Sequence, residues 1–466
     1  MLVSGAIVRY PQNGPLASGI SQILSEDGLR TAFWGIYMQD VESGEILYSY
    51  NDANTFIPAS NQKLFVSATA LHVLGSSYRY RTALYFDGTV RGDVLNGDLI
   101  LRGSGDPTFG SAFARGGDPL RLWARSLAEL GVRRIEGRII GDDNVFDDEP
   151  YAEGWDIDYV TNQSSRLLGV STNGLAYNDN VVEVKIRASS AGRPPIIESS
   201  PAGYLEIKNN MTTRGRQRGI AVKTNRVLGG ETIEFQGSIP QNYAGTIVMP
   251  VTNPTALAVQ SFTHYLEEHD IEVDAEAVDI DNISDLEYSR ESPLFVYVSP
   301  PLTQILPLVN KSSNNFYAEQ VFRTFSYGGS ARGGERRIKE LLSSAGASTE
   351  AISIRDGSGL SRKNFVTPES MAKLLTYMYS HSERDAFLES LPRGGEPQST
   401  LRHRLHNLPV FAKTGSLEYA RALSGYTTTR SGQTVAFAVF ANNYSMPSYH
   451  ITQSIDRIVM ELASAQ

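Results

Sequence analysis

The sequence predicts an α+β fold, in which a five-stranded antiparallel sheet with flanking helices is interrupted by a large β-rich insertion. Strand-like segments near both ends of the chain alternate with helical patterns, and these segments add up to five strands. From about residue 80 to about residue 285 the pattern changes to short β-rich pieces between Gly, Asp and Asn turns. The 466 residues suffice for two or three domains. We therefore expect the sheet domain at 1–80 and 286–466, and the insertion at 81–285.

The composition narrows the class of protein. Hydrophobic residues make up 41% of the chain and charged residues 20%, which is typical of a soluble globular protein. The net charge of -9 argues against nucleic acid as a partner. The chain has no cysteine, so disulfides and thiolate metal sites are excluded. No run approaches the roughly twenty apolar residues of a membrane span.

The elements before the insertion follow from their periodicity. Helical spacing runs from about residue 16 to 29, and two β-rich segments, 31–39 and 45–50, follow as a hairpin. A helix then runs from Ser60 to a stop at Gly75. We expect this helix to bury one apolar face and to leave Ser60 at its N-terminal end, where the helix dipole favours developing negative charge.

The remaining elements are predicted in the same way. In the insertion we expect strands at 93–103, 135–142, 181–187 and 246–250, and a helix at 120–130. After it we expect helices at 302–309, from Asn315 onward, at 334–345 and at 368–380. Three strands at 410–416, 420–429 and 434–441 complete the sheet, and a helix at 449–463 closes the chain.

One candidate for chemistry is the pair Ser60 and Lys63. On a helix, residues three apart lie on the same face, so the Lys63 ammonium can reach the Ser60 hydroxyl. A serine hydroxyl is a poor nucleophile, and a lysine with a lowered pKa can take its proton. The pattern alone is weak, because Ser370 and Lys373 repeat it and about one match is expected by chance. In isolation it is more typical of a helix N-cap beside a solvated lysine.

Two further motifs accompany the first. Ser313-Asn314-Asn315 forms a Ser-x-Asn element, which Ser312 and Asn314 would also satisfy, and Lys413-Thr414-Gly415 follows an apolar, strand-like stretch. Ser-x-x-Lys, Ser-x-Asn and Lys-Thr-Gly in this order are the signature set of penicillin-recognising serine enzymes. The pair Ser370 and Lys373 comes after the Ser-x-Asn element, out of order, so we interpret it as ordinary helix surface.

With these motifs the chain resembles the class C low-molecular-mass penicillin-binding proteins, which are D-alanyl-D-alanine carboxypeptidase/endopeptidases of bacterial cell walls. Other segments also resemble family landmarks, among them 103–108, 141–147, 177–180 and 356–361. The resemblance covers nearly the whole chain. It implies a penicillin-recognising serine transpeptidase-like domain with one or two extra domains nested between the first and second motifs. It also favours Ser313 and Asn315, because the residues that follow match the family in that register.

The resemblance implies a role for each motif residue. Ser60 attacks the carbonyl between two D-alanines and forms an acyl-enzyme, and Lys63 is our choice for the base, although either Lys63 or Lys413 could be the neutral lysine. Ser313 relays a proton to the leaving amine, and Asn315 binds the substrate amide.

Substrate binding is implied for residues of the third motif and for one residue of the insertion. Lys413, Thr414 and Ser416 bind the terminal carboxylate, and Gly415 lets the strand approach the ligand. The oxyanion hole is formed by the backbone amides of Ser60 and Ser416. Asp158 is a candidate for binding the cationic end of the peptide side chain.

The expected partners are peptidoglycan stem peptides and β-lactam antibiotics. We expect no nucleic acid, membrane span, cofactor or metal, and the oligomeric state is left open. His403 and His406 are one helical turn apart but lack further ligands at metal spacing, so we interpret them as surface histidines.

Residues 1–10 lack the pattern of a secretory signal. Because the family works outside the inner membrane, we expect a mature or trimmed chain in the periplasm or another extracytoplasmic compartment.

Two alternatives to a D,D-peptidase are considered. A serine β-lactamase is disfavoured, because no glutamate between Asn315 and Lys413 has an asparagine four residues later, as the deacylating element of the class A enzymes does. A non-catalytic, penicillin-binding-like module for wall attachment would be free to lose part of the triple motif. This chain keeps all of it.

Overall fold

The computed structural model describes residues 14–111, 116–156, 171–215, 219–226, 230–274, 276–284 and 286–466. The described residues form two compact units. Unit 1 holds the chain up to Tyr78, the short segment Ala152–Gly154, and Pro301–Gln466. Unit 2 holds Arg79–Tyr151 and Trp155–Pro300. No helix among the described residues is long and apolar enough to cross a bilayer.

Unit 1 is built on a five-stranded sheet, which confirms the predicted fold class. The strands are β1 (Phe33–Asp40), β2 (Ile46–Tyr50), β16 (Val410–Leu417), β17 (Ala420–Thr428) and β18 (Thr434–Asn442). Their order is β16-β17-β18-β1-β2, and every neighbouring pair is antiparallel. The N-terminal hairpin therefore pairs with the C-terminal strands through β1 and β18, which joins the two ends of the chain in one sheet.

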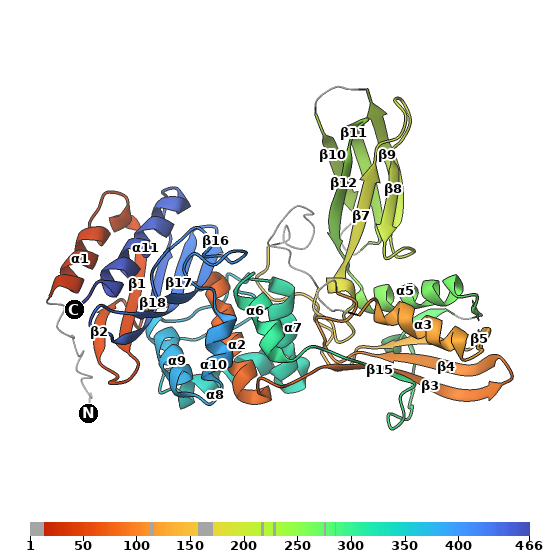
Figure 1. Cartoon of the computed structure of the whole chain (residues 1–466), viewed down its shortest axis with the longest axis horizontal. Coiled ribbons are helices and arrows are strands. Elements are labelled where there is room, and N and C mark those ends of the chain that lie inside the picture. The colour runs from red at the N-terminus through yellow and green to blue at the C-terminus, as the bar shows by residue number, and fades with distance from the viewer. Residues whose placement is uncertain are drawn as a thin grey trace. The chain divides into compact units, whose positions relative to one another are not determined.

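Helices cover both faces of this sheet. Helices α1 (Pro15–Leu24) and α11 (Ser448–Ala463) contact one another and share a hydrophobic core with Trp34, Ile36 and Met38 of β1 (Figure 1). Helix α9 (Pro368–Ser380) contacts β1 and β18. A Cβ at Gly35 would lie 2.8 Å from the Pro368 ring, so α9 meets the opposite face.

The helical part of unit 1 surrounds α2 (Gln62–Leu74). Its other members are α6 (Leu302–Asn310), α7 (Asn315–Phe325), α8 (Ala331–Ser344) and α10 (Arg384–Ser390). Helix α2 contacts all four of them and α9. All residues from Gln62 to Leu71 are buried, whereas the sequence led us to expect one buried face. The reason is that neighbouring helices pack on every side of α2, so it is a core helix.

Unit 2 contains one larger and two smaller sheets. The larger sheet consists of β3 (Arg81–Arg91), β4 (Val94–Arg102), β5 (Arg134–Glu136), β6 (Ile139–Asp142), β13 (Glu272–Val273), β14 (Ala277–Asp279) and β15 (Phe295–Val298). The smaller sheets are β9 (Glu206–Arg214) with β10 (Ala221–Arg226) and β11 (Thr232–Pro240), and β7 (Val181–Arg187) with β8 (Ile196–Ser200) and β12 (Ala244–Pro250). One hydrophobic core extends through all three sheets, so unit 2 holds together as one body.

Two helices pack in this core. Helix α3 (Pro119–Glu129) lies where the sequence predicts one, and it contacts α5 (Pro254–Glu268), which the sequence analysis missed (Figure 1). A local signal for α5 was present: Asn253 caps the helix by accepting a hydrogen bond from Ala256 N, and Pro254 follows it. Unit 2 reaches Pro300, beyond the expected boundary at 285, because β15 pairs with β3.

Candidate active site

The centre of the candidate site is the junction between a 3₁₀ turn, η2 (Ala59–Asn61), and helix α2. Ser60 lies in this turn, and Lys63 lies in the first turn of α2. The Lys63 Nζ is 3.1 Å from Ser60 Oγ, so the side chains meet as the three-residue spacing predicts. Lys63 is fully buried. Its Nζ also donates to Asn315 Oδ1 at 2.7 Å and to the Ser358 carbonyl oxygen at 2.5 Å.

Two glycines let the chain approach the turn that carries Ser60. A Cβ at Gly415 of β16 would lie 2.6 Å from the Pro58 carbonyl oxygen. A Cβ at Gly359 would overlap the carbonyl oxygen of Ala59, and Gly359 itself has a φ of +84°. Ala59 has a positive φ of 48°. The η2 turn is therefore held between two segments that reach it only because they carry no side chain there.

The second motif lies between α6 and α7. Ser313, with a φ of 59°, ends the connection, and Asn315 begins α7. The intervening Asn314 caps α7, since its side chain accepts from Tyr317 N at 3.1 Å. The structure thus brings Ser313 and Asn315 to the two lysines and uses Asn314 for capping, while Ser312 is exposed.

The third motif lies on β16. Lys413 is fully buried, and its Nζ donates to Ser313 Oγ and to the Thr414 carbonyl oxygen, both at 2.9 Å. The Lys413 carbonyl oxygen accepts from Asn61 Nδ2 at 2.8 Å, which ties β16 to the η2 turn. Thr414 and Gly415 are buried, whereas Ser416 is exposed.

Burial changes the protonation of both lysines. It lowers the pKa of the Lys63 ammonium to about 7, against the opposing effect of the Asp356 and Glu319 carboxyls. It also lowers the pKa of Lys413 well below the usual value, and the charge of Lys63 acts in the same direction. A lysine with a pKa near 7 is partly neutral at neutral pH, so Lys63 can accept a proton from the hydroxyl that it contacts.

Two buried carboxyls complete the surroundings of Lys63, and the sequence analysis assigned no chemistry to either. Glu319 accepts hydrogen bonds from Gly357 N at 3.0 Å and from Ser358 N at 2.7 Å. Asp356 accepts from Gly359 N at 2.9 Å and from Ser361 N at 2.7 Å. Both residues lie in segments that resemble family landmarks, and that was the available signal. Together they fix the loop whose Ser358 carbonyl oxygen accepts a hydrogen bond from Lys63 Nζ.

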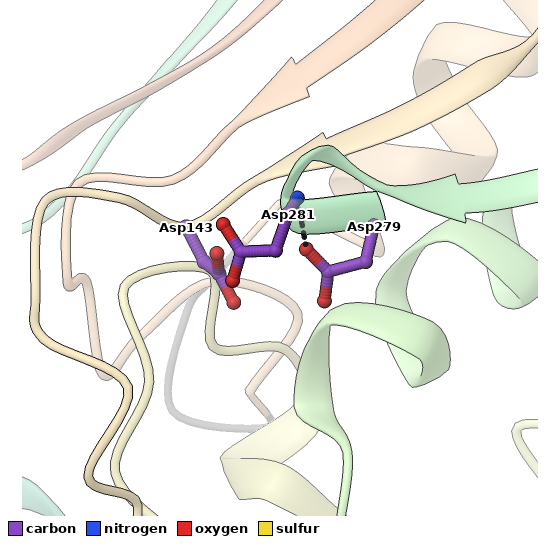
Figure 2. Close-up of side chains that lie close together, drawn as sticks. All are labelled: Asp143, Asp279 and Asp281. Atoms are coloured by element: carbon purple, nitrogen blue, oxygen red, sulfur yellow. Dashed lines mark hydrogen bonds between the residues drawn. The ribbon is translucent and has the colours of Figure 1, made fainter. Parts of the chain in front are cut away.

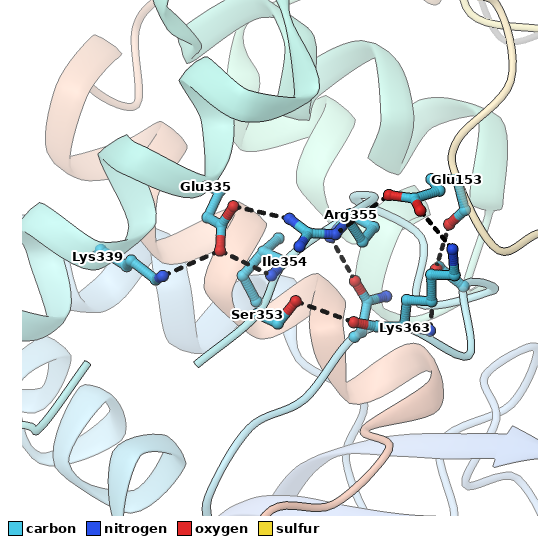
Figure 3. Close-up of polar contacts among 9 residues, drawn as sticks. Glu153, Glu335, Lys339, Ser353, Ile354, Arg355 and Lys363 are labelled. Atoms are coloured by element: carbon cyan, nitrogen blue, oxygen red, sulfur yellow. Dashed lines mark hydrogen bonds and ion pairs between the residues drawn. The ribbon is translucent and has the colours of Figure 1, made fainter. Parts of the chain in front are cut away.

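The loop at 356–361 is also held by an ion-pair network (Figure 3). Arg355 pairs with Glu335 of α8 at 3.0 Å and with Glu153 at 3.5 Å. Glu153 also pairs with Lys363, and its carbonyl oxygen accepts from Ser361 Oγ at 2.5 Å. Taken singly, exposed pairs of this kind stabilise a fold little, because water and salt screen them. As a network they nevertheless hold both ends of the loop against the rest of unit 1.

The second Ser-x-x-Lys pattern and the two histidines have other surroundings in the structure. Ser370 belongs to the capping box of α9, and Lys373 pairs with Glu369 at 2.6 Å, so this second Ser-x-x-Lys is a structural part of a helix. Among the described residues, neither His403 nor His406 joins a group of possible metal ligands. Asp158 lies outside the described residues.

Known proteins resemble this chain over most of its length. A family model described as the D-Ala-D-Ala carboxypeptidase 3 (S13) family matches residues 16–462. The chain is 31% identical over 467 residues to the D-alanyl-D-alanine carboxypeptidase of Actinomadura sp. (strain R39), covering 96% of this chain and 84% of the relative. It is 25% identical over 437 residues to D-alanyl-D-alanine carboxypeptidase DacB of Haemophilus influenzae, covering 88% and 85%.

Among solved structures, the crystal structure of penicillin binding protein 4 (dacB) from Haemophilus influenzae matches with a TM-score of 0.78 at 23% identity, and the match covers 96% of this chain and 99% of that one. This likeness confirms the fold. The match to the family model spans both units and all three motifs, and it confirms the resemblance that the motifs indicated. The chain belongs to the D-Ala-D-Ala carboxypeptidase 3 (S13) family.

Proposed function

We propose that the chain is a serine D,D-peptidase that cleaves the D-Ala-D-Ala bond of peptidoglycan stem peptides through an acyl-enzyme on Ser60. The observation that carries this proposal is the buried Lys63 ammonium, 3.1 Å from the Ser60 hydroxyl and with a pKa lowered to about 7. The peptide cross-links of peptidoglycan contain the same type of bond after a D-alanine, and the same acyl-enzyme chemistry can cleave them. The proposed function therefore includes endopeptidase activity.

In the first step, neutral Lys63 takes the proton of Ser60 Oγ as this oxygen attacks the carbonyl carbon of the penultimate D-alanine. The tetrahedral oxyanion is bound by the backbone N–H groups of Ser60 and Ser416, and such donors are commonly worth about 3 kcal/mol each. The η2 turn supports this role, because it holds the Ser60 backbone at the start of a buried helix, where the dipole favours negative charge.

In the second step, the C–N bond breaks and the leaving amine takes a proton from Ser313 Oγ. The hydrogen bond from Lys413 Nζ to Ser313 Oγ at 2.9 Å supports this relay, since Lys413 can return the proton to the hydroxyl. The terminal D-alanine departs and an ester on Ser60 remains. The proton that Lys63 took from Ser60 passes to Lys413, which restores both lysines. Water then attacks the ester with neutral Lys63 as the base, and Ser60 Oγ takes this second proton back as the shortened peptide leaves.

Substrate binding is assigned to residues of the second and third motifs. Lys413, Thr414 and Ser416 bind the terminal carboxylate. The negative charge of this group favours the protonated form of Lys413 against the effect of burial, so that a cation and hydroxyl donors meet the carboxylate. The backbone of Gly415 lets the peptide lie along β16, and Asn315 binds the substrate amide. Asp158 remains our candidate for binding the cationic end of the peptide side chain.

We also propose that β-lactams acylate Ser60, as they contain a strained amide that presents a carboxylate in the same way. A solved complex of penicillin binding protein 4 from Haemophilus influenzae with a β-lactam has a TM-score of 0.73 to this chain. Because the substrate is cell-wall peptidoglycan, we place the protein in an extracytoplasmic compartment.

The test is intact-mass spectrometry after exposure to benzylpenicillin, followed over hours and located by peptide mapping. We expect a long-lived adduct on Ser60 in the wild-type protein and none in Ser60→Ala. Ser312→Ala is the matched control, because Ser312 is an exposed serine beside the second motif, and it should form the adduct normally.

Three results would contradict the proposal. An adduct in Ser60→Ala would mean that another serine reacts. Rapid return to the free mass with hydrolysed drug would identify a β-lactamase. No adduct, together with no release of D-alanine from a stem peptide, would identify a non-catalytic module.

A further inference from the structure

Three aspartates from two separate segments of unit 2 converge at one end of the larger sheet. Asp143 follows β6, Asp279 ends β14, and Asp281 lies in a 3₁₀ turn, η4 (Ile280–Asn282), directly after β14. Strands β6 and β14 pair in parallel, so their carboxyl ends meet at the same edge. One carboxylate oxygen from each aspartate lies within 4.8 Å of the others, and Figure 2 shows the three side chains gathered together.

The three carboxylates border a cavity of about 170 Å³. Its lining includes two more aspartates, Asp147 and Asp148, and two asparagines, Asn173 and Asn253. No lysine, arginine, histidine or cysteine is among the lining residues that the structure describes. The described part of the lining therefore offers oxygen ligands and a negative charge.

One carboxylate oxygen of Asp143 lacks a hydrogen-bond partner among the described residues. Its side chain is 8% exposed. One oxygen, Oδ2, accepts from Asn173 Nδ2 at 2.7 Å and from the Thr255 hydroxyl. The other oxygen, Oδ1, is buried and has no hydrogen-bond partner within the part of the chain that the structure describes. A buried carboxylate oxygen without a partner is costly, and a bound cation would satisfy it.

The neighbouring residue shows how the same unit neutralises a buried carboxylate elsewhere. Asp142 pairs with Arg102 at 3.4 Å and with Arg290 at 3.7 Å. In the described ranges, no ion pair is found for Asp143, Asp279 or Asp281. Burial and the charge of Asp143 instead raise the pKa of Asp279 to about 6, which reflects the cost of holding these carboxylates together.

We propose that Asp143, Asp279 and Asp281 form a binding site for a hard divalent cation, with Ca²⁺ as the best fit. Hard cations take carboxylate and amide oxygens as ligands, and Ca²⁺ accepts irregular oxygen cages in which Mg²⁺ would keep most of its water. The absence of nitrogen and sulfur donors from the described lining disfavours zinc and copper. Asp281 is exposed and provides the entrance, while Asn173 and Thr255 orient Asp143 from behind.

A bound cation would have a structural consequence for unit 2. Asp143 belongs to the segment after β6, and Asp279 and Asp281 belong to the turn after β14, which Asp279 Oδ1 already closes by accepting from Asp281 N at 3.1 Å. The cation would link these two segments, which are far apart in the sequence. It would therefore stabilise the folded state by mass action, because the unfolded chain does not bring the ligands together.

The test uses the full chain, stripped of metal with a chelator and then titrated with CaCl₂ alone and with MgCl₂ alone. Isothermal titration calorimetry should show one Ca²⁺ bound per chain, and the melting temperature should rise with the Ca²⁺ concentration. The double variant Asp279→Asn and Asp281→Asn should bind Ca²⁺ more than about tenfold more weakly and lose the rise in melting temperature. Asp93→Asn, a change in the exposed turn between β3 and β4, is the matched control and should respond like the wild-type protein.

Folding of the double variant is checked by its melting temperature without metal, which should not fall, because the change relieves repulsion between carboxylates. Thr255→Val, which keeps all three aspartates, should weaken Ca²⁺ binding by about tenfold through Asp143. The proposal is overturned if the wild-type protein binds no Ca²⁺, if it binds Mg²⁺ but not Ca²⁺, or if the double variant binds Ca²⁺ like the wild-type protein. Since Ca²⁺ binding is measured without substrate, none of these results depends on the activity of Ser60.

Discussion

In the proposed mechanism Lys63 and Lys413 carry the proton transfers, and burial prepares both side chains for this role. Each ammonium is fully buried and contacts a serine hydroxyl, Lys63 that of Ser60 and Lys413 that of Ser313. Burial disfavours the charged form of a lysine, and the closeness of the two charges adds to this effect. The pair can therefore hold fewer protons than two exposed lysines would, which is what a base and a relay require.

The pH dependence of acylation follows from the pKa of Lys63. This pKa is lowered to about 7, so the neutral form, which acts as base, is lost as pH falls below 7. We expect the rate of acylation by benzylpenicillin to fall about tenfold per pH unit below that point and to level off above it. Stopped-flow measurements from pH 5 to 9 would show this, and a flat profile would remove Lys63 from the role of base.

Glu319→Gln is the matched test of this assignment. The negative charge of Glu319 raises the pKa of Lys63, while burial raises the pKa of Glu319 itself to about 7, so Glu319 still carries part of its charge at this pH. Removal of this charge should move the inflection of the rate profile to lower pH. The glutamine oxygen can still accept from Ser358 N, which preserves the loop. If the inflection stayed where it is in the wild-type protein, the titrating group would be another one.

Lys413→Met tests the binding of the terminal carboxylate. Methionine keeps the volume of the buried side chain but removes its charge. We expect kcat/KM for a peptide with a free terminal carboxylate to fall by about 10- to 100-fold more than for its amide, since a charged hydrogen bond is worth roughly 1.5–3 kcal/mol. Lys373→Met, in the second Ser-x-x-Lys, is the control and should affect neither peptide. Equal losses on both peptides would remove this role from Lys413.

At the scale of elements, the site depends on how closely strand β16 approaches the η2 turn. The approach is fixed by the hydrogen bond from Asn61 Nδ2 to the Lys413 carbonyl oxygen and by the missing side chain at Gly415. Helix α2 cannot move away to relieve a clash, because it is buried on all sides along its first ten residues. The geometry of Ser60 is therefore set by packing between elements.

Gly415→Ala tests this arrangement. The new Cβ would lie 2.6 Å from the Pro58 carbonyl oxygen and 3.1 Å from the Ala422 Cβ, so β16 or the turn must shift. We expect a loss of about 1–3 kcal/mol in the free energy of unfolding, as overpacking usually costs, and slower acylation. Urea unfolding and acylation kinetics measure the two effects. Gly215→Ala is the control, because a Cβ there meets open space; equal behaviour of the two variants would contradict the close approach.

At the scale of the whole molecule, unit 2 is an insertion whose two ends lie side by side. Ser299 N donates to the Tyr80 carbonyl oxygen at 3.1 Å, and Tyr80 N donates to Ser299 Oγ at 2.9 Å. A compact unit with adjacent ends and its own hydrophobic core can be inserted into another fold without disturbing it. In unit 1, β1 near the start of the sequence pairs with β18 near its end, and this pairing completes the five-stranded sheet.

We expect residues 79–300, produced as a separate chain, to fold by themselves. Their core is continuous and their ends are already paired, so the fragment should show a cooperative thermal transition by circular dichroism. It should take no benzylpenicillin, because all three motifs lie in unit 1. A fragment without a cooperative transition would show that unit 2 depends on the rest of the chain.

The sequence by itself determined the three motifs, their order and most of the elements that carry them. The hairpin at 31–50, the helix after Ser60 and the three C-terminal strands are set by the spacing of apolar residues along the chain. That spacing is a local property, so it can be recognised without knowing the fold. The reach from Lys63 to Ser60 is also local, since both belong to one helical turn.

Only the tertiary structure decided the rest. The burial of Lys63 on all sides and the carboxyls of Glu319 and Asp356 beside it depend on contacts between segments far apart in the sequence. The same holds for the cluster around Asp143, which joins Asp279 and Asp281 from a segment far away in the sequence. A lowered pKa or a shared ligand arises from desolvation and proximity, which exist only once the elements have packed together.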